Sequence, residues 1–548
     1  MFNTTAQSRG FVCSGRRSHR PNGLRDAGRY NAANPALALG ARISGVSFFQ
    51  SDPLRDTLKR RAGARPGLIL PAVLLILALL GLLAAGFTFQ VNADYAATQA
   101  LTERMQTRLA AEAGFHYVTL LLRENLDDVN AWYDNEEKMR GVLVWTSVGA
   151  RGQAAFGEVE DFDQESREES YKPAYRFSLV ADNPADDEFR VRYGITDESA
   201  KLNINKATEK QLTGLIAQVV TEEVAVAPLV AALLDWRDED ENVHSNGAES
   251  DYYRSLTVPY RCKNAPFDTV EELLMVRGFT GQILYGEDAD RNGLLSLNEN
   301  DGEISFPPDD EDDTLNRGLY PYITVYSVDY NRANDNKPRI LLSGGGQDSR
   351  ARLEEFFTEE EVTYLLSAGA GGGQGKAASL TAYLDAASTN GVSSPFRLED
   401  FPRIVDYCTL SPSLELPGLI NINTAPPIVL RALGDLTEEE ITAIVQKRAA
   451  LDSETKKTTA WLLAERVLEQ DRYNSIANFI TARGLQFNVE VIGHGDHIGS
   501  RIRLQIIFAM RGPVPQIVYY RDLTNLGVTY PLRREEEEEW SQSSDGLG

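Results

Sequence analysis

One uncharged apolar stretch constrains this chain more than any other feature. No charged residue occurs in 66–93, and its centre, residues 68–87, is almost wholly aliphatic. Because a helix rises about 1.5 Å per residue, the stretch can cross a hydrocarbon layer about 30 Å thick. The basic segment 59–65 before it favours a cytoplasmic start, so the chain beyond residue 90 should lie across the membrane. A cleaved secretory signal is the alternative, but no small-residue cleavage site follows the apolar run.

Charge is distributed unevenly along the chain. Residues 1–66 hold 12 Lys/Arg and three acids, a net charge of +9. The net charge of the whole chain of 548 residues is −25, so the residues after 66 carry a net charge of −34. Such an acidic surface repels polyanions such as nucleic acids and attracts divalent cations. The basic leader shows no periodicity, and either an over-extended start or a cytoplasmic arm accounts for it. We assign it no function.

The apolar stretch continues into an amphipathic helix. Over 94–127, apolar residues recur at three-to-four spacing. The stripe consists of Leu101, Met105, Leu109, Ala113, Tyr117 and Leu120. The pattern predicts a helical spine that leaves the membrane, and a coiled-coil dimer would produce the same stripe over a longer stretch.

Segments of alternating hydrophobicity occur near both ends of the remaining chain. They are 174–181, 188–195, 486–492, 501–510 and 516–521. This period of two predicts antiparallel strands with one buried face. An acidic, helix-rich block of about 280 residues separates the two groups, so we expect one sheet interrupted by an inserted domain.

The inserted block contains an internal repeat. Residues 202–207 (Leu-Asn-Ile-Asn-Lys-Ala) recur at 420–425 (Ile-Asn-Ile-Asn-Thr-Ala), and each copy precedes an expected helix, at 209–220 and 427–433. The Asn side chains can cap the helix or close turns ahead of it. Helix-hairpin-helix DNA-binding modules carry a similar motif. Here, however, Glu438, Glu439 and Glu440 follow the turn, which opposes binding to phosphate.

A calcium loop is the sharpest candidate site. Residues 288–299 match the pattern D-x-D-x-N-G-x5-E. The expected oxygen ligands are Asp288, Asp290, Asn292, the carbonyl of Leu294, Ser296 and Glu299. Gly293 permits the sharp turn. An acidic surface loop is the alternative, and Gly302 and Pro307-Pro308 oppose a paired EF-hand. The five acids 309–313 could ligate too, although such runs are usually solvated.

The sequence offers no catalytic constellation. The five His residues are scattered, and no Ser/His/Asp, Cys/His or phosphate-cradling arrangement occurs, so we expect no enzyme. The three cysteines are too few for a disulfide framework. Cys262 and Cys408 could pair in an oxidising compartment or remain two separate buried thiols.

Several of these motifs together resemble one family. The junction 65–67 (Arg-Pro-Gly) ahead of an apolar helix resembles a prepilin peptidase site. The acidic run 234–241, followed by 246–253 and 266–278, is similar in order and spacing to the hallmark of the minor pseudopilin K family of type II secretion. Most pilins carry glutamate at mature position five; Ala72 stands there in this chain, as is normal in that family. The resemblance covers 67 to about 530, except for apparently extra sequence over 343–411.

The resemblance implies a processing step, partners and a location. Prepilin peptidase would cut between Gly67 and Leu68, and the new amino terminus would be methylated. The chain would be a single-pass inner-membrane protein with its bulk in the periplasm. It would cap a short pseudopilus together with minor pseudopilins I and J, assist protein export, and bind calcium in its helical domain.

The expected fold class is α+β, in which a membrane and spine helix leads into a pilin-type antiparallel sheet with a large inserted helical domain. By resemblance, that domain holds two sterile-alpha-motif-like subdomains. The expected boundaries are 1–66 leader, 67–130 membrane and spine helix, 131–200 and 481–530 sheet, 201–342 and 412–480 helical subdomains, 343–411 insertion and 531–548 disordered acidic tail. Two functional alternatives remain open: a DNA-uptake module and a calcium-dependent surface adhesin.

Overall fold

The computed structural model describes most of the chain after the leader. The described residues are 69–126, 128–146, 174–183, 190–220, 224–342, 347–369, 379–384, 393–496, 498–512, 514–532 and 536. The leader and the expected cleavage site at Gly67 and Leu68 therefore lie outside them, as does nearly all of the acidic tail. The chain divides into two units, 1–83 and 84–548.

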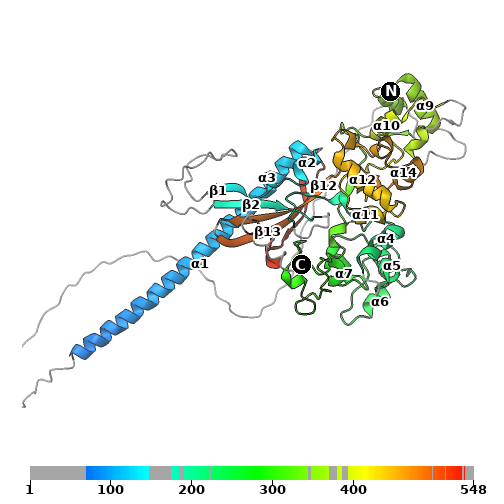
Figure 1. The fold of residues 1–548 in the computed structure, drawn as a ribbon. Helices are drawn as coiled ribbons and strands as arrows, with labels where there is room; N and C mark the ends of the chain where they lie inside the picture. The colour runs from blue at the N-terminus through cyan, green and yellow to red at the C-terminus, as the bar shows by residue number, and fades with distance from the viewer. Residues whose placement is uncertain are drawn as a thin grey trace, which may run out of the picture. The chain divides into compact units, whose positions relative to one another are not determined.

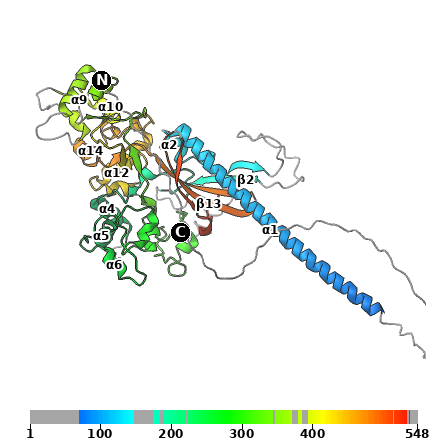
Figure 2. The same cartoon turned by 180° about the vertical axis from the view of Figure 1, so that it is seen from behind.

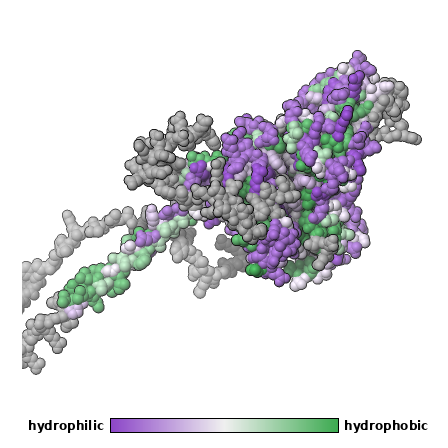
Figure 3. Space-filling model, viewed as in Figure 1, coloured by the Kyte–Doolittle hydropathy of each residue, from purple (hydrophilic) through white to green (hydrophobic). Residues whose placement is uncertain are grey.

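A single long helix, α1, runs over Ile69–Asn125 (Figure 1). Its apolar first part is long and hydrophobic enough to cross a membrane, and none of the scored window is buried by the rest of the protein. Figure 3 shows apolar residues gathered along this part of the helix. The expected membrane helix is thus confirmed by length and composition.

The second part of α1 packs against the sheet through small residues. Thr107, Ala111, Gly114 and Val118 are buried there. Gly114 leaves no room for a side chain, since an added Cβ would lie 2.5 Å from a methyl carbon of Val491. Close contact between helix and sheet therefore fixes which face of α1 turns inward.

The predicted apolar stripe does not lie on that inward face. Leu101 and Met105 are 64% and 66% exposed, and Leu109 and Leu120 are each 51% exposed. Around Gly114, bulky side chains would separate the helix from the sheet, whereas further along α1 Leu121 and Leu122 are buried in the same core. These four residues of the stripe are therefore left on the surface, whereas Tyr117 packs partly against Phe177 of the sheet.

One antiparallel sheet gathers strands from both ends of the chain (Figures 1 and 2). Its strands are β1 (Val142–Thr146), β2 (Ala174–Val180), β3 (Thr196–Asp197), β12 (Gln486–Gly495), β13 (Ile498–Ala509) and β14 (Gln516–Asp522). The order is β1-β2-β12-β13-β14, and β3 also pairs with β12. In register, Val491 lies opposite Leu179 on one side and Leu504 on the other. The expected mixed fold, apolar helix and antiparallel sheet are confirmed.

The strand predicted over 188–195 is wrong. Of its described residues, only Arg192 bridges, to Ala181, and the short β3 begins afterwards. Val191, Tyr193 and Ile195 are instead buried in the core under the sheet. Their alternation thus reflects packing of an extended segment rather than a strand ladder.

The region between β3 and β12 is mainly helical. Its α-helices are α4 (Glu209–Val219), α5 (Val226–Arg237), α6 (Ser250–Arg254), α7 (Gly281–Tyr285), α8 (Gln347–Leu353), α9 (Glu359–Gly369), α10 (Phe401–Tyr407), α11 (Pro427–Ala432), α12 (Glu438–Ala450), α13 (Trp461–Ala464) and α14 (Gln470–Ile476). Two short helices, α2 (Val129–Trp132) and α3 (Glu136–Met139), link α1 to the sheet. The region's short strands are β4 (Leu202–Asn203), β5 (Ile323–Thr324), β6 (Val328–Tyr330), β7 (Ile340–Leu341), β8 (Cys408–Thr409), β9 (Glu415–Pro417), β10 (Ile420–Asn421) and β11 (Ile480–Thr481).

The sequence repeat is also a repeat of local structure. β4 pairs in parallel with β5, and β10 does so with β11. Asn203 and Asn421 each accept the N–H of the residue two positions on, closing the expected turns. Arg237 donates to the carbonyls of residues 204 and 207, and Arg448 donates to those of 422 and 425. Two copies of one motif therefore build the region.

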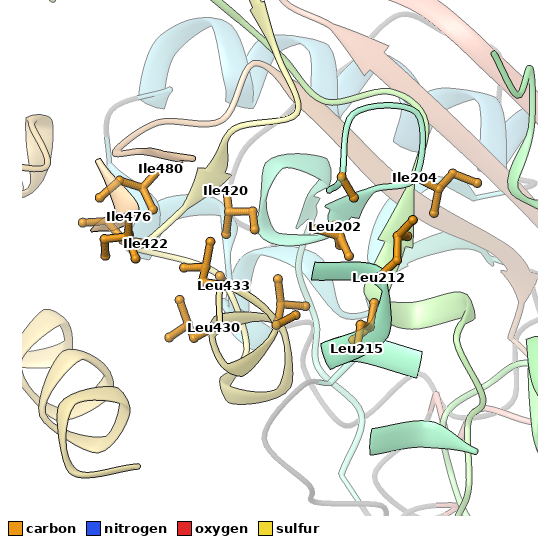
Figure 4. Packing of buried hydrophobic residues seen from close by; sticks show 14 of the residues in the cluster. Leu202, Ile204, Leu212, Leu215, Ile420, Ile422, Leu430, Leu433, Ile476 and Ile480 are labelled. Atoms are coloured by element: carbon orange, nitrogen blue, oxygen red, sulfur yellow. The ribbon is translucent and has the colours of Figure 1, made fainter. Parts of the chain in front are cut away.

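The two copies share a single hydrophobic core. α4 packs on α11, and a Cβ added at Gly214 would lie 3.4 Å from the Cα of Ala432. Figure 4 shows Leu212 and Leu215 of α4 and Leu430 of α11 among the buried apolar side chains of this one cluster. The described part of 343–411 joins the same core through Leu353, Val362 and Phe401. The helical region is thus continuous, and the extra segment is folded onto it.

Candidate metal centre

The expected ligand residues of loop 288–299 converge in space. Oxygens of Asp288, Asp290 and Glu299 lie within 4.8 Å of one another. Asp288 is 7% exposed and Glu299 is 1% exposed, so both are buried. Arg291 and Gly293 adopt positive φ angles of 58° and 70°, which turn the backbone around the carboxylates. The loop therefore folds around its acids rather than displaying them to solvent.

Hydrogen bonds within the loop hold its carboxylates in place. Asp288 accepts the N–H groups of Asn292 at 3.0 Å and Gly293 at 2.9 Å. Glu299 accepts the N–H of Ala289 at 2.9 Å and the hydroxyl of Ser296 at 2.6 Å. Asn292 and Ser296, two further expected ligands, therefore lie beside the three carboxylates.

The two most buried carboxylates of the loop form no ion pair within the described chain. Among the described residues, neither Asp288 nor Glu299 has an ion-pair partner. Burial, and then the charges of Glu299 and Asp290, raise the pKa of Asp288 to about 8. Burial likewise raises the pKa of Glu299. A hard cation with oxygen preference would relieve this repulsion, so the residues present fit calcium.

The loop is built onto the sheet rather than onto the helical region alone. The side chain of Leu294 lies in the core under the sheet. Arg503 of β13, which is 0% exposed, donates to the carbonyl of Asp290 at 2.6 Å and to that of Arg291 at 2.5 Å. The same guanidinium bonds Glu490 of β12 at 2.6 Å. One buried arginine thus joins two sheet strands to the loop backbone.

Buried acids make stability in the absence of metal sensitive to pH. The pKa of Asp197 is raised to about 6, that of Glu287 to about 7 and that of Asp288 to about 8, and burial is the main cause in each case. The folded state therefore holds protons that the unfolded chain has released, and its stability falls as pH rises through this window. In EDTA, we expect the melting temperature to fall between pH about 6 and about 8, as measured by differential scanning fluorimetry.

A matched variant checks the origin of that fall. Asp288→Asn should make the fall smaller, because Asp197 and Glu287 still contribute, whereas Asp251→Asn, at an exposed aspartate, should leave it unchanged. A melting temperature that rises over this range in EDTA would contradict the prediction.

A second acidic cluster, for which the sequence motifs predicted no metal, lies at the C-terminal end of α5. Oxygens of Asp235 and Asp238 and a ring nitrogen of His244 lie within 4.8 Å of one another. Asp235 is 0% exposed, accepts the N–H of Ala248 at 2.6 Å and lies 2.5 Å from Nδ1 of His244. Its side-chain hydrogen bond is the main cause that raises the pKa of His244. The acids of 234–241 could be read from the sequence. The turn that brings His244 close to Asp235 could not be predicted from it.

Glu249 lies near this second cluster, close enough for the charges of Asp235 and Asp238 to act on it. It is 3% exposed, and among the described residues neither of its carboxylate oxygens accepts an N–H or O–H hydrogen bond, although the thiol of Cys262 lies near it. Oδ1 of Asp238 is likewise buried without a partner. Burial, and then the charge of Asp235, raise the pKa of Glu249 to about 7. Unpartnered buried carboxylate oxygens beside other acids suit a cation, so this cluster is a second candidate metal site.

Acids of 309–313 accept hydrogen bonds from the segment that follows loop 288–299. Asp309 accepts the N–H groups of residues 301 and 302 at 2.9 and 2.8 Å. Asp313 accepts the side-chain amide of Asn300 at 2.7 Å. These acids therefore fold the segment that follows loop 288–299, and their carboxylates stand outside the cluster that Asp288 forms.

The structure also decides between a Cys262–Cys408 disulfide and two separate thiols. Cys262 and Cys408 are both buried and free. Burial raises the pKa of each thiol to about 12. They are two separate buried thiols.

Comparison with known proteins points to one family. A family model described as type II secretion system protein K matches residues 187–285. This match includes the first copy of the repeat and the second acidic cluster, and it ends just before loop 288–299.

Individual relatives carry the same description. The type II secretion system protein K of Klebsiella pneumoniae is 28% identical over 218 residues, which are 40% of this chain and 59% of that protein. The Aeromonas hydrophila counterpart is 36% identical over 75 residues, 14% of this chain and 23% of its own length. The matches thus span less than two thirds of either relative.

A solved structure shows a weaker likeness. One chain of the GspK-GspI-GspJ complex of the type 2 secretion system from enterotoxigenic Escherichia coli aligns over 78% of this chain and 99% of its own length. The sequence identity is 12% and the TM-score is 0.33. A score this low supports no inference about this chain.

Proposed function

We propose, from the premise that this chain is a relative of type II secretion system protein K, that it is a minor pseudopilin and not an enzyme. The proposed location is the inner membrane, with α1 as a single-pass anchor and the rest of the chain in the periplasm. Processing after Gly67 by prepilin peptidase and methylation of Leu68 belong to the same proposal. The observation that carries it is the combination of a protein K domain with an apolar helix and an antiparallel sheet.

The tip of a pseudopilus is the proposed position in the assembly. The argument is steric, since a bulky helical region is inserted into the sheet-bearing head. Subunits along a tightly packed helical filament have little space for such an addition. The terminal subunit has space for it, because no further subunit lies above it. We propose that the chain assists protein export from this position. The sterile-alpha-motif-like character of the two copies remains part of the proposal.

Minor pseudopilins I and J are the proposed partners. The exposed stripe of α1 supports this, because four large apolar side chains, Leu101, Met105, Leu109 and Leu120, face away from the protein's own sheet. Burial of such side chains against neighbouring helices contributes about 1.5 to 3 kcal/mol each. Pseudopilin helices that pack side by side would bury this stripe.

Calcium is the proposed ligand of loop 288–299 and of the cluster around Glu249. Oxygen donors dominate both sites, and each holds buried negative charge without a neutralising Lys or Arg partner among the described residues. A cation in the loop would stabilise the region where loop and sheet meet. The proposed role is therefore structural.

Co-purification tests the proposed assembly. We expect the full chain to capture pseudopilins I and J from co-expressing cells, because α1 offers them an apolar face. Leu101→Asp with Met105→Asp should reduce the captured amount at least about tenfold, as measured by quantitative immunoblotting. Gln99→Asp, exposed elsewhere on the same helix, should leave capture unchanged. If both variants capture equal amounts of pseudopilins I and J, the stripe is not part of the interface.

The same preparations separate the two alternatives. A DNA-uptake module would bind DNA at low salt, whereas the net −34 beyond residue 66 opposes binding. A surface adhesin would not require cleavage after Gly67, which amino-terminal sequencing detects. Strong DNA binding or an unprocessed terminus would contradict the pseudopilin proposal.

A further inference from the structure

β14 is an edge strand of the main sheet, and its outer side is unpaired among the described residues. Leu523, just after the strand, donates its N–H to the carbonyl of Arg503 in β13 at 2.8 Å. Because antiparallel strands alternate between bonded and unbonded pairs, the backbone of Tyr519 and Arg521 faces β13 and that of Tyr520 faces outward. No described residue bonds to the N–H or the carbonyl of Tyr520. The edge therefore offers backbone donors and acceptors to a further strand.

β14 also carries apolar side chains on the side of the sheet that α1 covers. Tyr520 lies opposite Ile506 of β13, a residue of the core under α1. Ile517 lies opposite Phe508, whose ring stacks on Phe115 of α1 with centroids 5.0 Å apart. Ile517 and Tyr520 themselves are 49% and 46% exposed. The apolar surface of the sheet thus continues beyond α1 to the edge and is left half-exposed there.

The charges of this edge strand are neutralised within the protein. Natural edge strands usually avoid pairing through charged side chains, prolines or bulges. β14 contains no proline and two charged residues. Arg521 pairs with Glu271, and Asp522 pairs with Arg108 of α1 at 3.2 Å. A bulge at Val518 interrupts the ladder only locally. An incoming strand would therefore meet little unpaired charge, and an uncharged strand fits this edge best.

The edge adjoins the exposed stripe of α1. Arg108 donates to the hydroxyl of Tyr520 at 2.9 Å. In the helix, Arg108 lies between Met105 and Leu109 of the stripe. Stable interfaces use about 20 to 30 residues on each side, whereas the stripe supplies four large exposed apolar side chains. A subunit held by the stripe must therefore cover further surface, and β14 is the apolar surface beside it.

We propose that β14 pairs with an extended segment in the head of the pseudopilin whose helix lies on the α1 stripe. This inference rests on the proposed function and extends the interface from side chains of α1 to the backbone of the sheet. A helix satisfies its own backbone groups, so the occupant of this edge is a strand. Main-chain hydrogen bonds supply the affinity in such strand addition, and alternate side chains supply the specificity. The added segment is uncharged and places an apolar side chain against Ile517 and Tyr520.

Proline at position 520 tests the pairing and spares the protein's own ladder. Tyr520→Pro removes the outward N–H, a change that edge strands tolerate. Tyr520→Thr is the matched variant, because it removes the same ring and keeps the N–H. In the capture experiment with co-expressed pseudopilins I and J, we expect Tyr520→Pro to capture at least about tenfold less than Tyr520→Thr. Equal capture by these two variants would overturn the inference.

Photo-crosslinking identifies the occupant and requires no proline. Val518, which is 39% exposed, is changed to cysteine and labelled with a benzophenone maleimide. Cys262 and Cys408 are buried, and Cys13→Ser removes the cysteine of the leader, so the label reacts at the edge. We expect an adduct with pseudopilin I or J. Labelled Val258→Cys, exposed in the helical region, should form none. Adducts only with a second copy, or only within the chain itself, would overturn the inference.

The outcomes separate this inference from the proposed function. If the two Tyr520 variants capture equally while Leu101→Asp with Met105→Asp captures less, the pairing of β14 is wrong and the proposed assembly stands. If the unaltered chain captures neither pseudopilin, the proposed function fails and the inference fails with it. Thermal melting checks the fold. If Tyr520→Pro melts well below Tyr520→Thr, the crosslinking result alone decides.

Discussion

Calcium is expected to raise the melting temperature of the full chain, and Asp288→Ala with Glu299→Ala is expected to remove most of that rise. Binding to the folded state alone stabilises it by about 2.7 kcal/mol when free calcium is one hundred times Kd. Asp288 and Glu299 are 7% and 1% exposed, and burial raises the pKa of both, so a bound cation would stabilise their ionised forms. Differential scanning fluorimetry of the detergent-solubilised protein, in EDTA and over a calcium series, measures the effect.

The second acidic cluster provides the comparison within the same protein. Asp235→Ala with Glu249→Ala removes its two most buried acids, which are 0% and 3% exposed. If both sites bind, each double variant should keep part of the calcium response, and the two losses should add because the sites share no ligand residue. Magnesium serves as the ion control, because it binds irregular sites rich in protein oxygens less well. A full calcium response in the Asp288→Ala, Glu299→Ala variant would exclude loop 288–299 as the principal site.

Arg503→Ala is expected to cause the largest loss of stability of any single substitution considered. The guanidinium is 0% exposed and bonds Glu490 and the carbonyls of residues 290 and 291. Removal of one partner from a buried ion pair costs about 3 to 5 kcal/mol, because the other charge remains buried without compensation. Chemical denaturation followed by tryptophan fluorescence measures the loss.

The same substitution should also weaken calcium binding, since Arg503 holds the backbone of two loop residues. Arg521→Ala is the matched control. Its partner is Glu271, and their side chains are 34% and 21% exposed, so the loss should be about 1 kcal/mol or less. If Arg503→Ala and Arg521→Ala cost the same, the buried arginine does not anchor the loop.

The pattern-based predictions succeeded where local chemistry determines the structure. Alternation identified β2, β12, β13 and β14, and the paired Asn motifs placed α4 and α11 within about a turn of their ends. The loop pattern also predicted correctly that Asp288, Asp290 and Glu299 lie close together. In each case the residues that matter lie close in sequence.

The misses share a different physical origin. The segment 188–195 alternates because it packs on a core, and only the positions of the other strands reveal that it has no ladder. The exposed α1 stripe was assigned no face, because the choice depends on the fit of Gly114 against Val491. Glu249 joined Asp235 through a turn that the acid run alone did not indicate. Long-range packing decides all three.

The construction of loop 288–299 also sets an order of events during folding. Its acids and backbone are held by Arg503 and by Thr529, whose hydroxyl contacts Asp290 and Asn292. Both residues lie more than two hundred positions further along the chain. The loop can therefore reach its final shape only after the last strands have been made and have paired. In a chain exported as proposed, binding of the ion would then follow the completion of export.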